Sequence, residues 1–446
     1  MKLAARVGRI VPSPTLSITA TAKAMAAQGI DVIDFASGEP DFDTPEPVKA
    51  AAEAAIRSGF TKYTPSSGID ELRNAIADKL KDEQGLHYDK SQILVSCGAK
   101  HSLYNVAEAL LEAGDELIIP VPFWVSYQDQ TLLNDATPVL LQTQERDGYT
   151  ISQEALEAVI TPRTKAIIVN SPCNPTGATY DRNTLERIAA VALRHDLVII
   201  SDEIYEKVLY DGVQHVSIAS LSPEVAARTV VINGVSKAYA MTGWRIGYAA
   251  GPKPLLTAMA NIQSQSTSNP CSISQKAAVA ALRLGNPFTT VMVAEFDRRR
   301  RLMVERLNKM PGMTCRMPTG AFYAFPNVSG LLTKRWNNQP IGSAANLATL
   351  ANPDITLTTN QSGYQNQWTN LKTWSGPQAG RYYVRVKTPV QSNNSRASNG
   401  FALRVWTGSS FSVCSTSERS ASPISAATDS TSRPVTSRTM TRPFCS

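Results

Sequence analysis

The stretch that decides the fold is TKAIIVNSPCNPTGATYDRNTLERIAAVALRHDLVIISDEIYE, residues 164–206. It begins with the apolar run TKAIIVN and passes through the turn-forming SPCNPTG. A segment with helical character, NTLERIAAVALRHD, and a second apolar run, LVIISDE, follow. Apolar runs of strand length separated by one helix predict a strand–helix–strand unit whose two parallel strands are buried.

The same alternation extends in both directions, from about Pro47 to Gly285. Examples are the helix-like VKAAAEAAIRSG and the strand-like DELIIPV. Repeated strand–helix units predict an α/β domain with a mostly parallel sheet and helices on both faces. Ligands of such sheets bind beyond the carboxyl ends of the strands. We therefore expect residues 47–285 to form a large, ligand-binding domain.

A second, smaller α/β domain is expected from residues 286–350, with residues 1–46 contributing to it. Residues 287–308, PFTTVMVAEFDRRRRLMVERLN, predict a long helix whose Arg298–Arg301 run lies on a solvated face. The following TCRMPTGAFYAFPNVS predicts a strand–turn–strand. The small domain is expected to be incomplete or replaced at its C-terminal end.

The character of the chain changes near Leu350. Residues 351–407 are rich in Asn, Gln, Ser, Thr and Gly and contain short alternating runs, RYYVRV at 381–386 and GFALRV at 400–405, which predict a polar β-rich segment. Residues 408–446 are rich in Ser, Thr and Arg with little apolar periodicity, and we expect them to be disordered. A fusion or a misjoined reading frame would explain this break.

Charge and cysteine content narrow the function classes. The chain of 446 residues has a net charge of +7, but residues 351–446 hold ten Lys/Arg and three Asp/Glu, which leaves 34 basic and 34 acidic residues in the body. The body therefore gives no reason to expect nucleic-acid binding. No apolar run approaches the roughly 18 to 20 residues of a membrane span, and no secretory signal is recognisable. Six scattered cysteines without a CxxC pair favour free thiols in the cytoplasm and give no metal site.

The first group of residues whose side chains could take part in a reaction is Ser236-Lys237, followed by Gly243-Trp244-Arg245. A lysine in an apolar neighbourhood loses its proton more easily than in water, where its pKa is about 10.4, and a neutral amine condenses with aldehydes. Ser236 and Arg245 offer donors that suit a phosphate. Taken alone, a lysine is more often a solvated surface residue.

Three further groups follow strand-like runs. Asp202 could pair with a ring nitrogen and Tyr205 could donate to a ring oxygen. Alternatively, Asp202 could be a helix cap and Tyr205 a core tyrosine. Asn174 could donate an amide N–H, or belong only to a tight turn. The fourth group, Gly98-Ala99-Lys100, would leave backbone N–H groups free for a phosphate at a helix start, although many ordinary helices begin this way.

Together these motifs make the chain resemble the fold-type I, class I pyridoxal-phosphate-dependent aminotransferases, and closely the bacterial aspartate aminotransferases. The resemblance covers about residues 3–349 and rests on seven ordered blocks: SGEPDFDTP (37–45), KYTPSSGIDELR (62–73), PFWVSY (122–127), NSPCNPTG (170–177), SDEIYE (201–206), SKAYAMTGWRIGY (236–248) and SQSTSN (264–269). It implies transfer of an amino group from an amino acid, with aspartate favoured, to a 2-oxo acid by a ping-pong mechanism.

The resemblance also implies a role for individual residues. Lys237 would bind pyridoxal 5'-phosphate as an aldimine and move the proton at the substrate α-carbon. Asp202 would hold the pyridine nitrogen, while Tyr205 and Asn174 would contact the ring oxygen. Trp124 would stack on the cofactor ring and also border the substrate. Gly38 and Asn174 would bind the substrate carboxylate. The phosphate site would be lined by Gly98, Ala99, Lys100, Ser236 and Arg245. Tyr63 would reach the phosphate of a partner subunit, which implies a homodimer with shared active sites.

Two departures from the family pattern concern the substrate. Relatives end in a small domain that carries an arginine for the substrate α-carboxylate, and this chain cannot be aligned past about Leu350. Arg385 in YYVRVKTP is a weak candidate for that arginine, because the segment around it does not match. Where relatives often read K-P-S-A-T, this chain reads Val11-Pro12-Ser13-Pro14-Thr15, so Thr15 without the lysine would contact a distal carboxylate.

Two alternatives remain open from the sequence. One is a lyase or synthase that uses the same cofactor on the same fold, which the motifs around Lys237 do not distinguish. The other is a cofactor-binding but catalytically impaired body fused to an unrelated C-terminal segment, which the unmatched ending favours.

Overall fold

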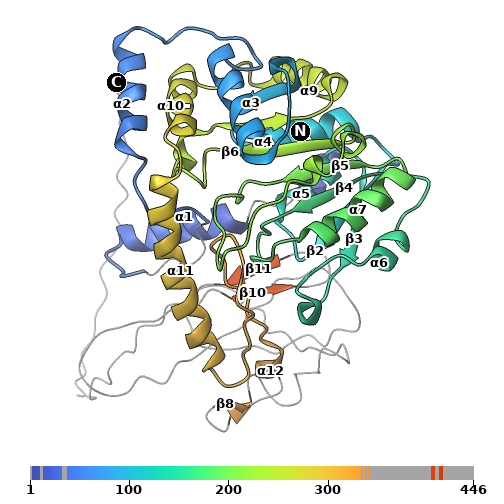
Figure 1. The fold of residues 1–446 in the computed structure, drawn as a ribbon. Coiled ribbons are helices and arrows are strands. Elements are labelled where there is room, and N and C mark those ends of the chain that lie inside the picture. Colours follow the sequence, from blue (N-terminus) through green and yellow to red (C-terminus); the bar gives the residue numbers. More distant parts are fainter. Residues whose placement is uncertain are drawn as a thin grey trace, which may run out of the picture.

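The computed structural model describes residues 3–10, 14–32 and 38–332, together with the short strands at 335–336, 339–340, 403–406 and 411–414 (Figure 1). Its helices are α1 (Pro14–Ala27), α2 (Glu46–Arg57), α3 (Asp70–Gln84), α4 (Ala99–Leu110), α5 (Ser126–Leu133), α6 (Gln153–Glu157), α7 (Arg182–Arg194), α8 (Pro223–Ala226), α9 (Lys253–Ser266), α10 (Ser272–Arg283), α11 (Pro287–Asn308) and α12 (Ser329–Leu332). Short 3₁₀ turns lie at Ala5–Arg9, Lys90–Gln92, Glu145–Asp147, Ile218–Ser220 and Thr242–Trp244.

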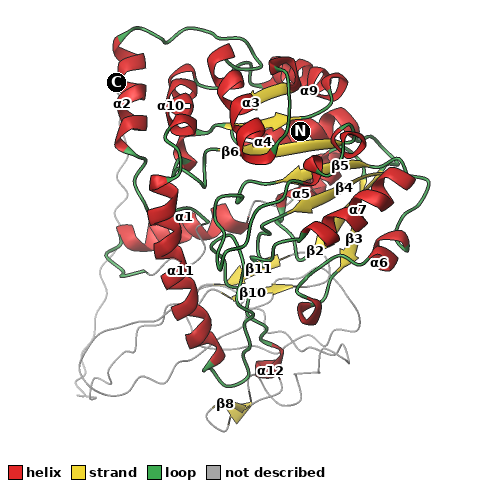
Figure 2. Ribbon diagram, viewed as in Figure 1, coloured by secondary structure: helices red, strands yellow, loops and turns green. Residues whose placement is uncertain are grey.

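A seven-stranded sheet lies at the centre of the fold, in the order β1-β7-β6-β5-β4-β2-β3 (Figure 2). Its strands are β1 (Ile93–Ser96), β2 (Glu116–Val121), β3 (Thr137–Gln142), β4 (Thr164–Asn170), β5 (Val198–Asp202), β6 (Thr229–Gly234) and β7 (Gly247–Ala250). The strands from β6 to β3 pair in parallel, whereas β7 runs antiparallel to both of its neighbours. The prediction of a mostly parallel sheet is therefore confirmed.

Alternation of side chains along the strands assigns the helices to the two faces of the sheet. Ile119 of β2 and Ile168 of β4 pack into one apolar cluster with α4, α5 and α9. Their chain neighbours Ile118 and Ile167 point the other way, into a cluster with α6 and α7. Toward β1 and β7, this second face packs against α2, α3 and α10. Apolar residues at consecutive strand positions thus require helices on both faces, as the sequence indicated.

The helix α7 shows how local sequence sets an element that was predicted. The side chain of Asp181 accepts a hydrogen bond from the backbone N–H of Thr184 at 2.8 Å, which caps the first turn. Leu185, Ile188 and Ala192 then recur at helical spacing and are buried against the sheet. The capping side chain therefore determines where the helix begins, and the apolar face determines how the helix packs on the sheet.

The long helix α11 leads from the end of α10 toward α12 (Figure 1) and has the extent expected from the sequence. The expectation that its arginine run is solvated is wrong for Arg300. That side chain is only 3% exposed and pairs with Asp211, at 2.9 and 3.0 Å, and with Asp297. Its guanidinium also lies 4.3 Å from the centre of the Tyr210 ring. Helical periodicity turns one residue of the run inward, and two carboxylates compensate its charge.

The predicted strand–turn–strand after α11 is not formed as such. The described segment 314–327 makes isolated bridges, Thr314 with Asn327 and Gly320 with Leu209, and otherwise follows loops. Its backbone hydrogen bonds go to other parts of the chain, for example from Gly320 N to Gly177 O at 2.8 Å. Tertiary contacts thus satisfy groups that the pattern assigned to a local strand pair.

Little of the polar C-terminal segment lies among the described residues. The strands β10 (Leu403–Trp406) and β11 (Phe411–Cys414) pair antiparallel, and β8 (Arg335–Trp336) pairs with β9 (Gln339–Pro340). The strand expected at 400–405 overlaps β10, whereas the one expected at 381–386 lies outside the described residues. β11 lies within residues 408–446, so the expectation of disorder is wrong for these four residues. The alternation in FSVC is short and is flanked by polar residues, so the sequence pattern did not indicate a strand there.

Among the described residues, no single helix has the length and apolarity to cross a membrane. One pair of consecutive helices, α10 and α11, satisfies that test jointly by length and composition, with a bend of 82° between them.

Candidate active site

The carboxyl ends of neighbouring strands bring the predicted residues to one edge of the sheet. Asp202 is the last residue of β5, Asn174 lies in the loop after β4, and Lys237 lies three residues after the end of β6. These strands are adjacent and parallel, so the segments that follow them leave the sheet at the same edge. The fold thereby places together groups that lie up to 63 residues apart in the sequence.

Lys237 is partly buried among aromatic rings. Its Nζ donates a hydrogen bond to the carbonyl oxygen of Gly38 and lies 5.8 Å from the centre of the Tyr205 ring and 5.6 Å from that of Phe322. Burial lowers the pKa of Lys237 to about 8, because the charged form is poorly solvated there. About a tenth of this amine is therefore neutral at pH 7, far more than for a lysine in water, and the neutral amine is the form that reacts with an aldehyde.

Asp202 is a buried carboxylate with neutral donors around it. The hydroxyl of Tyr127 donates to its Oδ2 at 2.6 Å, and the backbone N–H of Ile204 donates to its Oδ1 at 3.2 Å. Burial raises the pKa of Asp202 to about 6, against the opposite effect of these two hydrogen bonds. A buried carboxylate of this kind gains most from a cationic partner such as a protonated ring nitrogen.

Asn174 and Tyr205 meet at the hydroxyl of Tyr323. The Asn174 amide donates to this hydroxyl at 3.3 Å, and the hydroxyls of Tyr205 and Tyr323 lie 2.5 Å apart. The Oδ1 of Asn174 is buried and has no hydrogen-bond partner among the described groups. Buried polar atoms are nearly always paired in native structures, so this amide fits a site completed by another molecule.

A cradle for an anion lies between the start of α4 and Arg245. Gly98 caps α4 with φ of 90°, and a Cβ added to it would lie 2.4 Å from Nη2 of Arg245. Only glycine leaves room for the guanidinium this close to the helix start. The first N–H groups of a helix lack intrahelical acceptors, and together with an arginine they suit a phosphate. The nearby Ser236 is buried and Ala99 is the first residue of α4.

Trp124 and Lys100 lie on the α4–α5 side of this site. The Nζ of Lys100 lies 4.8 Å above the Trp124 ring, and the ring packs edge to face on Tyr127 with 5.5 Å between centroids. Burial, and then the charge of Arg245, lowers the pKa of Lys100. The site therefore offers a flat indole surface beside a basic cradle.

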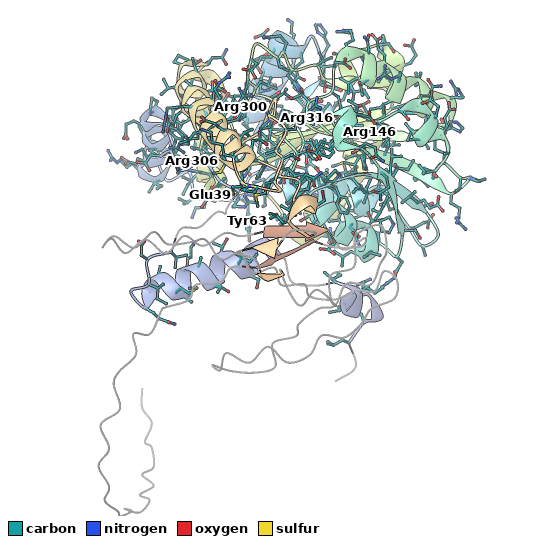
Figure 3. The ribbon with its side chains drawn as sticks, turned by 90° about the horizontal axis from the view of Figure 1, so that it is seen from below. Glu39, Tyr63, Arg146, Arg300, Arg306 and Arg316 are labelled. Carbon is teal, nitrogen blue, oxygen red and sulfur yellow. The ribbon has the colours of Figure 1, made fainter. Side chains whose placement is uncertain are left out.

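Three predicted residues do not join the site within the described part of this chain. Tyr63 is 92% exposed and extends from the surface (Figure 3). Thr15 belongs to α1, but its side chain is outside the described part of the structure, and Arg385 lies outside the described residues. Gly38, by contrast, is brought to the site through its contact with Lys237.

Sequence reasoning missed three aromatic residues of the site: Tyr127, Phe322 and Tyr323. Tyr127 lies within the quoted block PFWVSY, and its spacing of three from Trp124 was a usable signal for a shared face. Phe322 and Tyr323 come from the segment after α11, and no spacing in the sequence links them to the ends of β4, β5 and β6, which lie 88 or more residues earlier.

One further cluster has the geometry of a metal site. The ligand atoms of Glu203, Glu206 and His215 lie within 4.8 Å of one another. However, Nζ of Lys79 already lies 2.5 Å from Glu206, and Glu203 accepts hydrogen bonds from Ser217 and pairs with His215. These groups compensate one another's charge, so we interpret the cluster as an internal ion-pair network.

The chain is similar to known proteins both in sequence and in structure. A sequence model of the family "aminotransferase class I and II" matches residues 30–352. An aspartate aminotransferase of Geobacillus stearothermophilus is 50% identical over 327 residues, which cover 73% of this chain and 83% of that protein. An aspartate/prephenate aminotransferase of Cereibacter sphaeroides is 50% identical over 329 residues, covering 74% and 82%. The crystal structure of the aspartate aminotransferase from Rhizobium meliloti superposes with a TM-score of 0.72 at 47% identity, covering 75% of this chain and 84% of that one.

Proposed function

The chain belongs to the aminotransferases of class I and II, and from this premise we propose that it transfers the amino group of aspartate to a 2-oxo acid through the site around Lys237. As a member of this family it is a pyridoxal-phosphate-dependent aminotransferase with amino acid and 2-oxo acid substrates. The similar proteins are aminotransferases, so a lyase or a catalytically impaired body is not favoured.

The residues present fit pyridoxal phosphate. Asp202 is a buried carboxylate in need of a cationic partner, Asn174 has a buried, unsatisfied amide oxygen, and Gly98 leaves a cradle beside Arg245 that a side chain would fill. We assign the ring nitrogen to Asp202, the ring oxygen to Asn174 and Tyr205, and the ring face to Trp124. The phosphate is assigned to Gly98, Ala99, Lys100, Ser236 and Arg245.

Lys237 carries the reaction in this proposal, and its burial among aromatic rings is the observation that supports it best. When bound, the cofactor supplies an aldehyde that accepts amines and a ring that withdraws electrons from the substrate α-carbon. Lys237 would hold the cofactor through its neutral amine and would move the proton at the substrate α-carbon. Asp202 would pair with the ring nitrogen, and Gly38 and Asn174 would hold the substrate carboxylate.

Aspartate is proposed as the amino donor from the names of the relatives. Thr15 is assigned to the distal carboxylate, since Val11 stands where many relatives have lysine. The test is an assay of the purified holoenzyme with a panel of amino donors and 2-oxoglutarate. A kcat/KM for aspartate above that for alanine and phenylalanine supports the assignment, and a preference for an apolar donor contradicts it.

We further propose a homodimer with shared sites. Tyr63 is a large aromatic residue that is 92% exposed, and burying such a side chain against a second copy would be favourable. In this arrangement Tyr63 of each subunit reaches the phosphate in the other. A cytoplasmic location is part of the same proposal and is supported by the four described cysteines, which are free thiols.

The domain division is also a proposal. Residues 47–285 contain the whole seven-stranded sheet and form the cofactor-binding domain, with residues 1–46 and 286–350 assigned to the small domain. The family match ends at residue 352, close to the change in composition. Residues 351–407 and 408–446 are proposed as a polar β-rich segment and a tail outside the family fold.

A further inference from the structure

The hydroxyl of Tyr323 lies where groups assigned to the substrate carboxylate, Gly38 and Asn174, meet Tyr205, which is assigned to the ring oxygen. It accepts a hydrogen bond from the Asn174 amide at 3.3 Å and lies 2.5 Å from the hydroxyl of Tyr205. A Cβ built on Gly38 would lie 2.7 Å from the same hydroxyl, so the backbone of Gly38 borders it directly. Gly38 and Asn174 are the two described groups assigned above to the substrate carboxylate.

The reacting amine lies beside this point. Lys237 donates a hydrogen bond to the carbonyl oxygen of Gly38, the residue whose Cα borders Tyr323. In an amino acid, the α-amino group and the α-carboxylate are attached to the same carbon. A substrate whose nitrogen takes the place of the Lys237 amine therefore directs its carboxylate to the neighbourhood of Gly38, which the Tyr323 hydroxyl borders.

The position of Tyr323 is set by the large domain. The preceding residues are fixed to loops at the strand ends, since Ala321 N donates to Val208 O at 2.9 Å and the Tyr210 hydroxyl donates to Ala321 O at 2.5 Å. The Tyr323 ring packs edge to face on Tyr205, with 5.6 Å between centroids. A donor held by packing and by its backbone needs little reorganisation when an anion binds.

We propose that the Tyr323 hydroxyl binds the α-carboxylate of the amino acid and 2-oxo acid substrates, next to Gly38 and Asn174. This rests on the proposed function. A carboxylate only accepts hydrogen bonds, and a phenol hydroxyl can donate to it in a charge-assisted bond. Tyr323 is thus a substrate-binding residue that comes from the segment after α11 rather than from a strand end.

The test uses Tyr323→Phe in the holoenzyme, because this change keeps the ring and its packing and removes only the hydroxyl. Two probes report on the carboxylate: an unreactive dicarboxylate, succinate, titrated by its effect on cofactor absorbance, and a single-turnover comparison of an amino acid with the amine that lacks its carboxylate. We expect succinate and the amino acid to bind about tenfold more weakly to the variant. The reaction of the amine is expected to be unchanged, as is binding of the cofactor.

A matched control is Tyr149→Phe, which removes the hydroxyl of a tyrosine whose ring packs edge to face on Phe325 of the same segment, with 6.1 Å between centroids, and which is not among the residues named above that position Tyr323. It is expected to bind succinate as wild type does. Wild-type succinate affinity in Tyr323→Phe, or an equal loss for amine and amino acid, would overturn the role of Tyr323 alone. A wild-type protein that binds the cofactor but reacts with no amino acid would overturn the proposed function and this proposal with it.

Discussion

Burial of a single amine accounts for the reactivity assigned to Lys237. Because burial brings its pKa to about 8, against about 10.4 for lysine in model peptides, its neutral fraction is already large at pH 8. We predict that acylation of Lys237 in the cofactor-free protein rises with pH with a midpoint near pH 8 and levels off about one pH unit higher. Mass spectrometry of the labelled peptide measures this. Labelling that instead follows a lysine model peptide, with a midpoint about two units higher, would contradict the burial argument.

The buried carboxylate of Asp202 costs stability until a cation pairs with it. Its folded pKa of about 6 lies above the ordinary value of 3.8, so its protonated form favours folding at low pH and this contribution is lost as the pH rises through about 6. A difference of roughly two units corresponds to about 3 kcal/mol. We predict that Asp202→Asn stabilises the cofactor-free protein at pH 7.5 by up to that amount, and by less at pH 5.

Urea unfolding of the cofactor-free variant and wild type at both pH values measures the sign of the difference in unfolding free energy. A stability difference that is the same at pH 5 and pH 7.5 would show that the charge of Asp202 is not its cause. With cofactor bound, the same variant should lose affinity, because the ring nitrogen no longer has a carboxylate beside it.

Sequence reasoning reached Lys237, Asp202, Tyr205 and Asn174 because each follows a strand-like run, and parallel strands end at one edge of the sheet. It missed Tyr323, because that residue reaches the site through tertiary contacts of its segment with Val208 and Tyr210, which leave no trace in local spacing.

At the scale of elements, α11 is fastened to the loop after β5 by Arg300 (Figure 3), whose side chain is 3% exposed. Arg300→Met leaves Asp211 and Asp297 without their buried partner and Pro318 O without its donor. We predict a loss of about 3 kcal/mol in unfolding free energy. The neighbouring Arg301→Met removes a 55% exposed arginine that pairs with the same carboxylates, and should cost less than about 1 kcal/mol. Equal losses in chemical denaturation would contradict the assignment of a buried role to Arg300.

The elements most faithfully predicted were those with strong local signals. TKAIIVN became β4 and LVIISDE contains β5, because continuous apolar runs fit only a strand buried on both faces. The segment 314–327 also alternates, yet apart from the bridge between Thr314 and Asn327 its backbone groups bond to other parts of the chain, such as Gly177 and Val208. The prediction that the whole arginine run of α11 is solvated was also wrong. Four consecutive residues of a helix point to all sides of it, so one of them faces the core.

At the scale of the whole molecule, the exposure of Tyr63 makes a prediction about shared sites. Lys237→Ala and Tyr63→Ala each impair the sites of their own homodimer. If Tyr63 serves the partner subunit, mixed dimers contain one intact site. Unfolding and refolding an equal mixture should restore roughly a quarter of the wild-type activity, because half of the dimers are mixed and each has one good site of two. No gain over the unmixed variants would contradict sharing of Tyr63.

The central claim, that Lys237 holds the cofactor in a site that accepts amino acids, is tested most directly by visible absorption. Purified protein is titrated with pyridoxal phosphate, and aspartate is then added, with Lys237→Ala as the control. The account predicts a band in the wild type that withstands dialysis and shifts when aspartate is added, and no dialysis-resistant band in Lys237→Ala. A wild-type protein that retains no band, or a Lys237→Ala variant whose band survives dialysis as the wild-type band does, would contradict the assignment of Lys237.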